Sequence, residues 1–454
     1  MKNIFKPPAA KEPFSSDLKT VNKKFNFLRN QVFIVSILGY MMYYFTRKSV
    51  DITGSHLMET GGLSTYNYAL MGMFFSITYG CSKFIIGGFA DRSSGRIVMT
   101  IGLLVSAILN IALGGVIQIG NGQITIAPLV VMIIILTALG IFQGMGWPAT
   151  ARMMAHWFTD KERSPRLAIW NSGQGLGAAF APLIIIPLIE LIDPGGTIYG
   201  LYYWVPSIIA LIFLPLVFWG LRDRPEAEGL PTVEKWKGIT ENAKEKTELK
   251  IKEIFVKYIL KNKYVWILAF ANIWVYVLRQ GMSSWAIKIA DEMHGIKLKD
   301  SKWLWSFFEW SGIAGGIFAA YGARYLFQNR KAPLMIFGLI IGIGGLVIFQ
   351  NAPRGNISVL ITAIIVAGFG VYMPQAMIGA TAIELTNKKA AATASGLTGL
   401  FGYFGDAVMS KPVVAGIAGN GNWDNVFYYF YACAIIAIIA LAFLWTKNQD
   451  NKVI

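Results

Sequence analysis

The stretch Gly39-Tyr-Met-Met-Tyr-Tyr-Phe-Thr-Arg47-Lys48 ends the first long apolar run of the chain and indicates how the rest is organised. The fourteen residues of Val32–Phe45 carry no charge. At about 1.5 Å per residue they reach about 21 Å, which is short of the roughly 30 Å hydrocarbon core of a bilayer. A helix that crosses a membrane here must therefore continue through Arg47 and Lys48. Because a cation inside a membrane is costly, these residues need an anionic partner or a water-filled cavity.

The same arrangement occurs once more, 232 positions further along the chain. Tyr264–Leu278 is apolar apart from Asn272, and it ends in Arg279. Two arginines flanked by aromatic residues, one in each half of the chain, predict a paired site for an anion of the size of phosphate.

Composition places the whole chain in a membrane. Of its 454 residues 55% are hydrophobic and 15% are charged, and the mean hydropathy is +0.50, which is too apolar for a soluble protein of this length. We predict an all-α membrane protein with twelve transmembrane helices. The predicted spans are 27–52, 66–90, 97–118, 127–156, 164–192, 199–221, 263–290, 302–327, 333–350, 358–384, 391–418 and 426–446.

The net charge of +16 does not indicate a nucleic-acid partner, because the basic residues lie in the loops between apolar runs. They concentrate in the segment up to Arg29 and in the loops 91–96, 160–166, 222–262, 324–331 and 388–389. Lys and Arg are absent from the loops 53–65, 119–126, 193–200 and 419–424. Loop 291–301 departs from this alternation with Lys297 and Lys299. The positive-inside rule predicts that both termini are cytoplasmic, and the polar N-terminus indicates no cleavable signal peptide.

The chain divides into two related halves in this interpretation. We predict a six-helix half at 1–221, a solvated cytoplasmic linker at 222–262 and a second six-helix half at 263–454. Gly144-Met-Gly-Trp-Pro148 and Gly370-Val-Tyr-Met-Pro374 lie 226 positions apart, an offset close to that of the two arginines. Such offsets suggest a parallel repeat, with a binding site in a central cavity between the halves.

Several motifs resemble those of known transporters. Gly87-Gly-Phe-Ala-Asp91-Arg92-Ser-Ser-Gly-Arg96, between the second and third spans, resembles the loop signature of the major facilitator superfamily. Further blocks resemble the organophosphate:phosphate antiporters, which include glycerol-3-phosphate and hexose-6-phosphate transporters and a hexose-phosphate sensor. These blocks are Tyr40-Met-Met-Tyr-Tyr-Phe-Thr-Arg47-Lys48-Ser, Ile77-Thr-Tyr-Gly-Cys-Ser-Lys83-Phe, Phe142-Gln-Gly-Met-Gly-Trp147-Pro148, Lys161-Glu-Arg163, Pro374-Gln-Ala-Met-Ile-Gly379 and Lys388-Lys-Ala-Ala-Ala-Thr-Ala-Ser-Gly.

The resemblance implies the major facilitator fold and a substrate site. Arg47 and Arg279 would bind the phosphate group, and Lys83 would add a third cation. Lys48 points about 100° away from Arg47 around the helix and is expected to contact a neighbouring helix or an interface. Residues that match the aromatic and polar lining of the family's site are Tyr40, Tyr44, Tyr79, Trp147, Asn171, Gln174, Tyr276, Tyr372 and Tyr403. Gln174 departs from the glycerol-phosphate carriers, which usually have a histidine there.

Ionisable residues outside the phosphate pair are predicted to balance charge or to gate. Glu309 is expected to pair with a cation such as Arg279 and to switch partner, although a structural ion pair is an alternative. Asp406 and Lys411 form a second candidate pair, with charge balance away from the substrate as the alternative. Asp91 and Arg92 in the signature loop complete this group.

We therefore expect a secondary antiporter, not an enzyme, that exchanges inorganic phosphate for a phosphorylated sugar by rocker-switch alternating access. Hexose 6-phosphate is favoured, and glycerol 3-phosphate is close behind. A membrane sensor of hexose phosphate and a proton-driven symporter stay open as alternatives. We expect no cofactor or metal, a location in the plasma membrane and a monomer.

Overall fold

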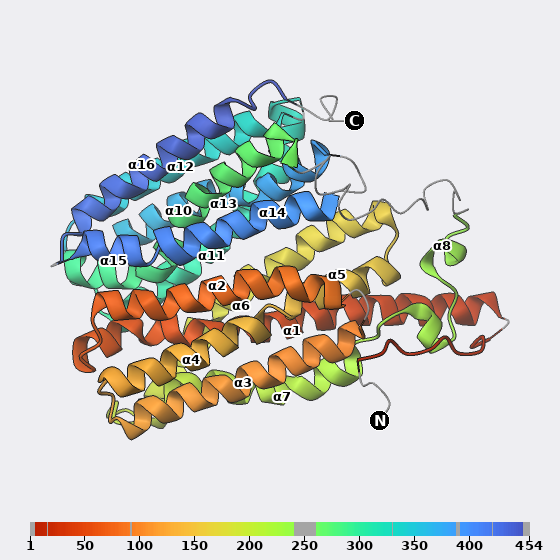
Figure 1. Ribbon diagram of the computed structural model, residues 1–454, viewed down its shortest axis with the longest axis horizontal. Helices are drawn as coiled ribbons and strands as arrows, with labels where there is room; N and C mark the ends of the chain where they lie inside the picture. Colours follow the sequence, from red (N-terminus) through yellow and green to blue (C-terminus); the bar gives the residue numbers. More distant parts are fainter. Residues whose placement is uncertain are drawn as a thin grey trace. The chain divides into compact units, whose positions relative to one another are not determined.

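The computed structural model describes residues 5–15, 17–90, 93–239, 260–328, 330–386, 391–419 and 421–447 (Figure 1). Within these ranges the chain forms helices and no β-strand. The first half of the sequence contains α1 (Leu18–Thr60), α2 (Thr65–Ala90), α3 (Gly95–Ile119), α4 (Ile126–Gln143), α5 (Gly146–Trp157), α6 (Asp160–Ile192) and α7 (Leu201–Gly220). The short helices η1 (Pro225–Glu228) and α8 (Val233–Trp236) follow.

The second half of the sequence contains seven further helical segments among the described residues. These are α10 (Lys263–His294), α11 (Leu298–Leu326), α12 (Lys331–Gln350), α13 (Ile357–Glu384), α14 (Ala391–Phe404), α15 (Pro412–Ala418) and α16 (Trp423–Ala442), with the π-helix η5 (Gly405–Met409) between α14 and α15.

The helices confirm the predicted all-helical membrane fold. Each predicted span coincides with one helix, except that α4 and α5 share the span 127–156, and that α14, η5 and α15 share the span 391–418. Eight described helices are long and apolar enough to cross a membrane. None of α1, α2 and α11 is among those eight, and these helices carry Arg47, Lys83 and Glu309. Arg279, by contrast, lies on α10, which is among the eight.

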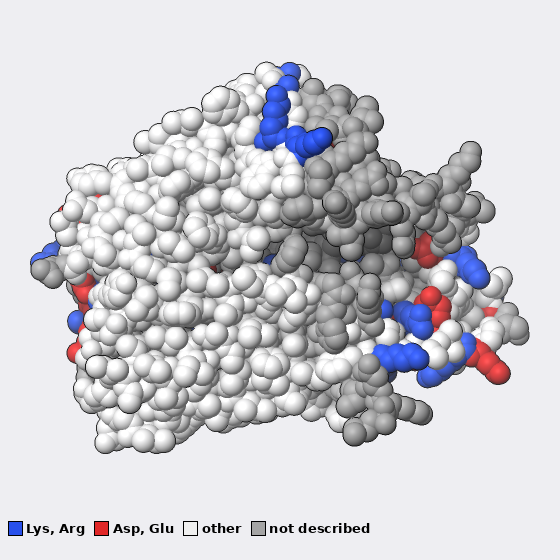
Figure 2. All heavy atoms as spheres, in the orientation of Figure 1, with Lys and Arg blue, Asp and Glu red and all other residues white. Residues whose placement is uncertain are grey.

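The surface is that of a protein surrounded by lipid. On the face drawn in Figure 2, Lys, Arg, Asp and Glu gather near helix ends, whereas other residues cover the lengths of the helices. Large aliphatic side chains are strongly exposed along several helices, among them Ile134, Ile212, Ile340 and Ile439. In water such patches would promote aggregation, whereas hydrocarbon chains solvate them.

Contacts divide the chain into two compact units. Unit 1 consists of Met1–Ile52, Cys81–Gly122 and Val130–Thr247. Unit 2 consists of Thr53–Gly80, Gln123–Leu129 and Glu248–Ile454. The last turns of α1 and the first part of α2 thus belong to the same unit as α10 to α16.

A buried amide holds three helices of unit 1 together. The Asn110 Nδ2 of α3 donates hydrogen bonds of 3.0 Å each to Ser49 Oγ on α1 and to Tyr203 O and Ser207 Oγ on α7. Asn110 itself is fully buried. Hydrogen bonds of this kind between membrane helices contribute about 0.6 kcal/mol each on average. The amide therefore fixes the register of α1 against α3 and α7.

The first part of the charged loop 222–262 is packed against unit 1. The Trp236 ring stacks on Phe25 with ring centroids 4.1 Å apart. Asp223 accepts hydrogen bonds from Ser94 Oγ (2.7 Å) and from the Arg96 backbone N–H (3.0 Å). Its carboxylate therefore pairs with a backbone N–H group in the first turn of α3 that has no acceptor within the helix. Residues 240–259 lie outside the described part of the chain.

Lys297, which departs from the loop-charge pattern, lies beside two carboxyl groups of unit 2. Its Nζ is 2.9 Å from Asp291 Oδ1 and 3.8 Å from Glu59 Oε1. A hydrogen bond to Asp291 raises the pKa of Glu59, and burial adds to this rise. The charge of Lys297 is therefore balanced locally.

In unit 2, α12 and α13 approach so closely that only glycine fits between their backbones. A Cβ atom on Gly345 would lie 2.3 Å from the backbone nitrogen of Ala367, and one on Gly370 would lie 2.4 Å from Gly338 O. Small residues at such crossings let helix backbones touch, which is how helices associate in lipid.

We expect Gly345→Ala to force α12 and α13 apart and to destabilise the protein by about 1–3 kcal/mol. Gly344→Ala, on the next residue of the same helix, is the matched control, because no atom lies within 4 Å of its added Cβ. The measurement is the melting temperature of the purified protein in detergent. Equal melting temperatures for the two variants would contradict the close helix crossing.

Candidate functional site

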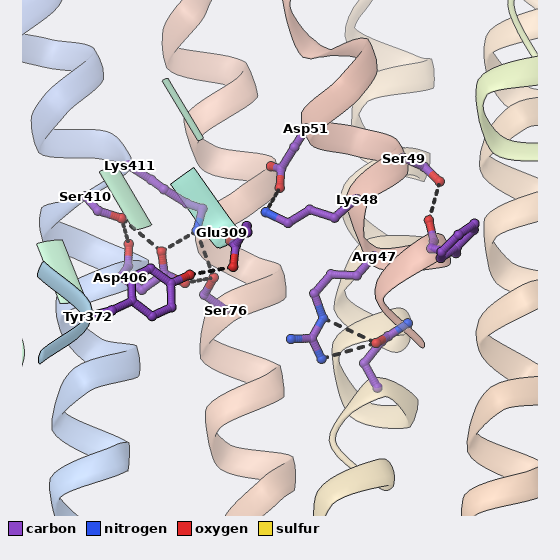
Figure 3. A network of polar contacts seen from close by, with 12 residues as sticks. Arg47, Lys48, Ser49, Asp51, Ser76, Glu309, Tyr372, Asp406, Ser410 and Lys411 are labelled. Carbon is purple, nitrogen blue, oxygen red and sulfur yellow. Dashed lines mark hydrogen bonds and ion pairs between the residues drawn. The ribbon is translucent and has the colours of Figure 1, made fainter. Parts of the chain in front are cut away.

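The first element of the candidate site is Arg47, which α1 places half-buried in unit 1 (Figure 3). Its Nε and Nη2 both donate to Gln143 Oε1, at 3.3 and 3.2 Å. Its guanidinium carbon lies 4.5 Å from the centre of the Tyr44 ring, within the range of a cation–π contact. These two partners are uncharged, so they orient the guanidinium without cancelling its charge.

Tyr40 and Tyr44 lie one turn apart on α1. Their rings meet edge to face with centroids 5.6 Å apart, and Tyr40 also packs on Trp170 at 4.5 Å. Both tyrosine side chains are buried. They form an aromatic wall beside Arg47, and their predicted contact with substrate stays a prediction.

Lys48 differs from Arg47 in having a carboxylate close by in its own helix. Its Nζ lies 2.9 Å from Asp51 Oδ2, one turn further along α1. Asp51 was not among the residues predicted from the sequence. This ion pair balances the charge of Lys48 locally.

Lys83 of α2 and Trp147 of α5 lie together in unit 1. The Lys83 Nζ is 5.0 Å from the centre of a Trp147 ring. Both residues are half-buried. The structure thus brings together two of the predicted site residues that are 64 positions apart in the sequence.

The second arginine, Arg279 of α10, lies in unit 2 and is buried. Its guanidinium carbon is 4.8 Å from the Tyr372 ring centre, within the range of a cation–π contact. The Tyr372 hydroxyl donates to Glu309 Oε2 at 2.5 Å. Tyr372 thus contacts both Arg279 and Glu309, and the direct pairing of these two residues stays a prediction.

Three further predicted tyrosines cluster in unit 2. Tyr403 of α14 lies between Tyr79 of α2 and Tyr276 of α10, with ring centroids 4.9 and 5.4 Å away. Both contacts are edge-to-face or close to it, the arrangement that aromatic quadrupoles favour. The cluster joins α2 to α10 and α14.

Asp406 and Lys411 form a buried ion pair at the π-helix η5, with Nζ and Oδ1 2.5 Å apart (Figure 3). Ser76 of α2 donates to Asp406 Oδ2 at 2.6 Å and accepts from Lys411 Nζ at 3.0 Å. Ser410 Oγ donates to Asp406 Oδ1 at 2.9 Å. A Cβ atom on Gly72 would lie 2.5 Å from Lys411 Cε, so Gly72 leaves room for the lysine stem. Sequence analysis missed Ser76, because serine is common in membrane helices and carries no charge signal.

Four predicted residues cannot be placed with the others. Asp91 and Arg92 lie outside the described residues. Asn171 and Gln174 lie on α6, but their side chains are outside the described part of the chain. Arg47 belongs to unit 1 and Arg279 to unit 2, and their joint action on one ligand stays a prediction.

Comparisons with known proteins agree with the fold and the motifs. Residues 36–410 match the family model described as Major Facilitator Superfamily. The "Glycerol-3-phosphate transporter" of Bacillus subtilis (strain 168) is 36% identical over 99% of both chains. The "Probable hexose phosphate transport protein" of Chlamydia trachomatis serovar D is 31% identical over 99% of this chain and 97% of its own. The "Membrane sensor protein UhpC" of Escherichia coli (strain K12) is 31% identical over 96% of both.

A solved structure shares the fold at low sequence identity. The inward-facing, unoccupied structure of a bacterial homolog of the human lysosomal transporter Spinster superposes with a TM-score of 0.67 and 14% identity. The match covers 92% of this chain and 96% of the other.

The buried pair gives a stability prediction. Asp406→Asn leaves the Lys411 ammonium without its carboxylate in a buried site, and we expect a loss of about 3–5 kcal/mol in unfolding free energy. The double variant D406N/K411M removes both charges and should recover most of this loss. The melting temperatures of the two variants in detergent test this, and a double variant no more stable than D406N would refute a charge-pair role.

Proposed function

Because this chain belongs to the major facilitator superfamily, and within it to the organophosphate:phosphate antiporter family, we propose that it exchanges inorganic phosphate for an organophosphate across the plasma membrane. The chain is a multi-pass membrane protein. We further propose cytoplasmic termini, two six-helix halves at 1–221 and 263–454, and a monomeric carrier.

The observation that carries the proposal is the chemistry around Arg47. The Gln143 amide oxygen accepts two hydrogen bonds from its guanidinium, and the Tyr44 ring centre lies 4.5 Å from its guanidinium carbon. A guanidinium inside a membrane protein favours an anionic ligand, and its planar fork matches two phosphate oxygens. Arg279, which lies 4.8 Å from the Tyr372 ring centre, offers the same chemistry in the second half of the chain.

The mechanism that we propose follows from the cost of buried charge. A site that brings Arg47, Arg279 and Lys83 together is costly to close when it is empty, since closing removes the water that solvates the cations. A divalent phosphate or organophosphate neutralises them and lowers this cost. Ligand binding thus favours the closed intermediate, and the empty carrier turns over poorly, which gives exchange instead of net flow.

Both substrate candidates share the phosphate group that the arginines would bind. The sequence blocks favour hexose 6-phosphate, whereas the relative of 36% identity is named a glycerol-3-phosphate transporter. Competition of each compound with phosphate uptake ranks the two. The similarity to a protein named a membrane sensor supports a second candidate, a receptor that binds hexose phosphate without transporting it.

Counterflow separates the carrier from the sensor. Purified protein in proteoliposomes loaded with labelled phosphate should release the label when hexose 6-phosphate or glycerol 3-phosphate is added outside, and not in buffer alone. Release that is unchanged by an imposed proton gradient excludes a proton-driven symporter. Folded protein that binds the organophosphate but releases no label would establish the sensor instead.

Arginine-to-lysine variants test the phosphate-binding pair. Lysine keeps the charge but loses the two-pronged hydrogen-bonding geometry, so we expect R47K and R279K each to reduce phosphate exchange at least tenfold. Arg354, an exposed residue between α12 and α13, provides the control, and R354K should exchange at the wild-type rate. Wild-type exchange by either site variant would show that the arginines do not bind phosphate.

A further inference from the structure

Gln143 is a fully buried amide at the C-terminal end of α4 in unit 1. Its Oε1 accepts both hydrogen bonds from Arg47, at 3.3 and 3.2 Å. Its Nε2 donates to Tyr43 O at 3.2 Å and to Thr46 Oγ1 at 2.9 Å. Thr46 Oγ1 in turn donates to Tyr43 O at 3.1 Å. The amide thus uses two acceptor positions and two donor hydrogens, which is its full capacity.

These contacts determine which way the amide faces. The carbonyl of Tyr43 can only accept, and the guanidinium of Arg47 can only donate. Exchanging the oxygen and nitrogen of the Gln143 amide would set donor against donor on one side and acceptor against acceptor on the other. The amide therefore has one orientation, in which its oxygen faces Arg47.

Neighbouring glycines and a serine fix the position of this helix end. Ser82 Oγ of α2 donates to Ile141 O at 2.6 Å. A Cβ atom on Gly144 would lie 2.5 Å from that same Ser82 Oγ, and one on Gly146 would lie 3.0 Å from the Tyr40 ring. The end of α4 is thus held against both α1 and α2, so Gln143 cannot shift without moving the backbone.

We propose that Gln143 is a positioning residue that orients Arg47 for phosphate binding, an inference that rests on the proposed function. By holding the Nε–Nη2 edge of the planar guanidinium, it sets the direction of the remaining N–H groups. Figure 3 shows the third nitrogen of Arg47 pointing away from the two dashed bonds. Because an amide is neutral, it orients the cation without lowering the cation's attraction for an anion. A carboxylate in the same place would lower that attraction.

The test compares two buried amides of unit 1. Gln143→Met keeps the approximate volume of the side chain but removes the acceptor, and Gln143→Glu places a competing negative charge on Arg47. Asn110→Leu is the matched control, because Asn110 is equally buried and makes three hydrogen bonds, all with Ser49, Tyr203 and Ser207.

We expect Q143M to raise the KM for phosphate exchange at least tenfold with a smaller change in kcat, and Q143E to raise the KM further. Asn110→Leu should lower the melting temperature but leave the KM within about twofold, since none of the hydrogen bonds that it removes involves the side chain of Arg47. An unchanged KM in Q143M, or an equal rise in N110L, would overturn the positioning role.

A binding measurement separates this inference from the proposed function. The rise in melting temperature that inorganic phosphate produces reports binding without transport. If the wild type binds phosphate but does not exchange it, the antiporter proposal fails, and a reduced rise in Q143M still supports the role of Gln143. If exchange occurs and Q143M matches the wild type in both measurements, Gln143 alone is refuted. A wild type that neither binds nor exchanges phosphate overturns both.

Discussion

A charged guanidinium held inside a membrane helix by neutral partners is the interaction on which the rest depends. Arg47 has an amide oxygen and a tyrosine ring as described partners, and Gln143 fixes its plane. Leaving such a charge in hydrocarbon would cost several kcal/mol, so the surrounding helices must enclose it and supply polar atoms. The closely packed ends of α1, α2 and α4 follow from that need, because the polar atoms must come from different helices.

Lys48 with Asp51 and Lys411 with Asp406 form ion pairs, which are neutral overall and whose removal as a unit would change little electrostatically. Such pairs suit the scaffold, because their energy does not depend on a ligand. Arg47 donates to the Gln143 amide and packs on Tyr44, and Arg279 packs on Tyr372. In the proposed exchange both arginines gain from an anion, which is what a ligand-driven carrier requires.

The sequence predicted the helices, and it pointed to the two arginines, whose role in binding stays a prediction, but it did not predict their partners. Apolar runs determine the spans because lipid requires a continuous hydrogen-bonded helix. The apolar runs before Arg47 and Arg279 are too short to cross a bilayer, which drew attention to both residues. Gln143, Ser76 and Asp51 were missed because an uncharged or locally paired side chain gives no pattern along the chain. Their roles arise only when α4 meets α1 and when α2 meets the π-helix. The packing of residues 222–239 was missed for a related reason: Trp236 and Asp223 find Phe25 and α3 through contacts remote in sequence.

A carrier that alternates must also have contacts that can break, and unit 2 contains candidates. Thr53–Gly80 belongs to this unit, and two polar groups fasten it there: Ser76 to the Asp406–Lys411 pair, and Glu59 to Asp291 and Lys297. The contact between Glu59 and Lys297 is exposed, so water can replace it at modest cost. Ser76 and the Asp406–Lys411 pair are buried, and the glycine-mediated crossing of α12 and α13 cannot open without leaving voids. Among these contacts the exposed one is therefore the easiest to break.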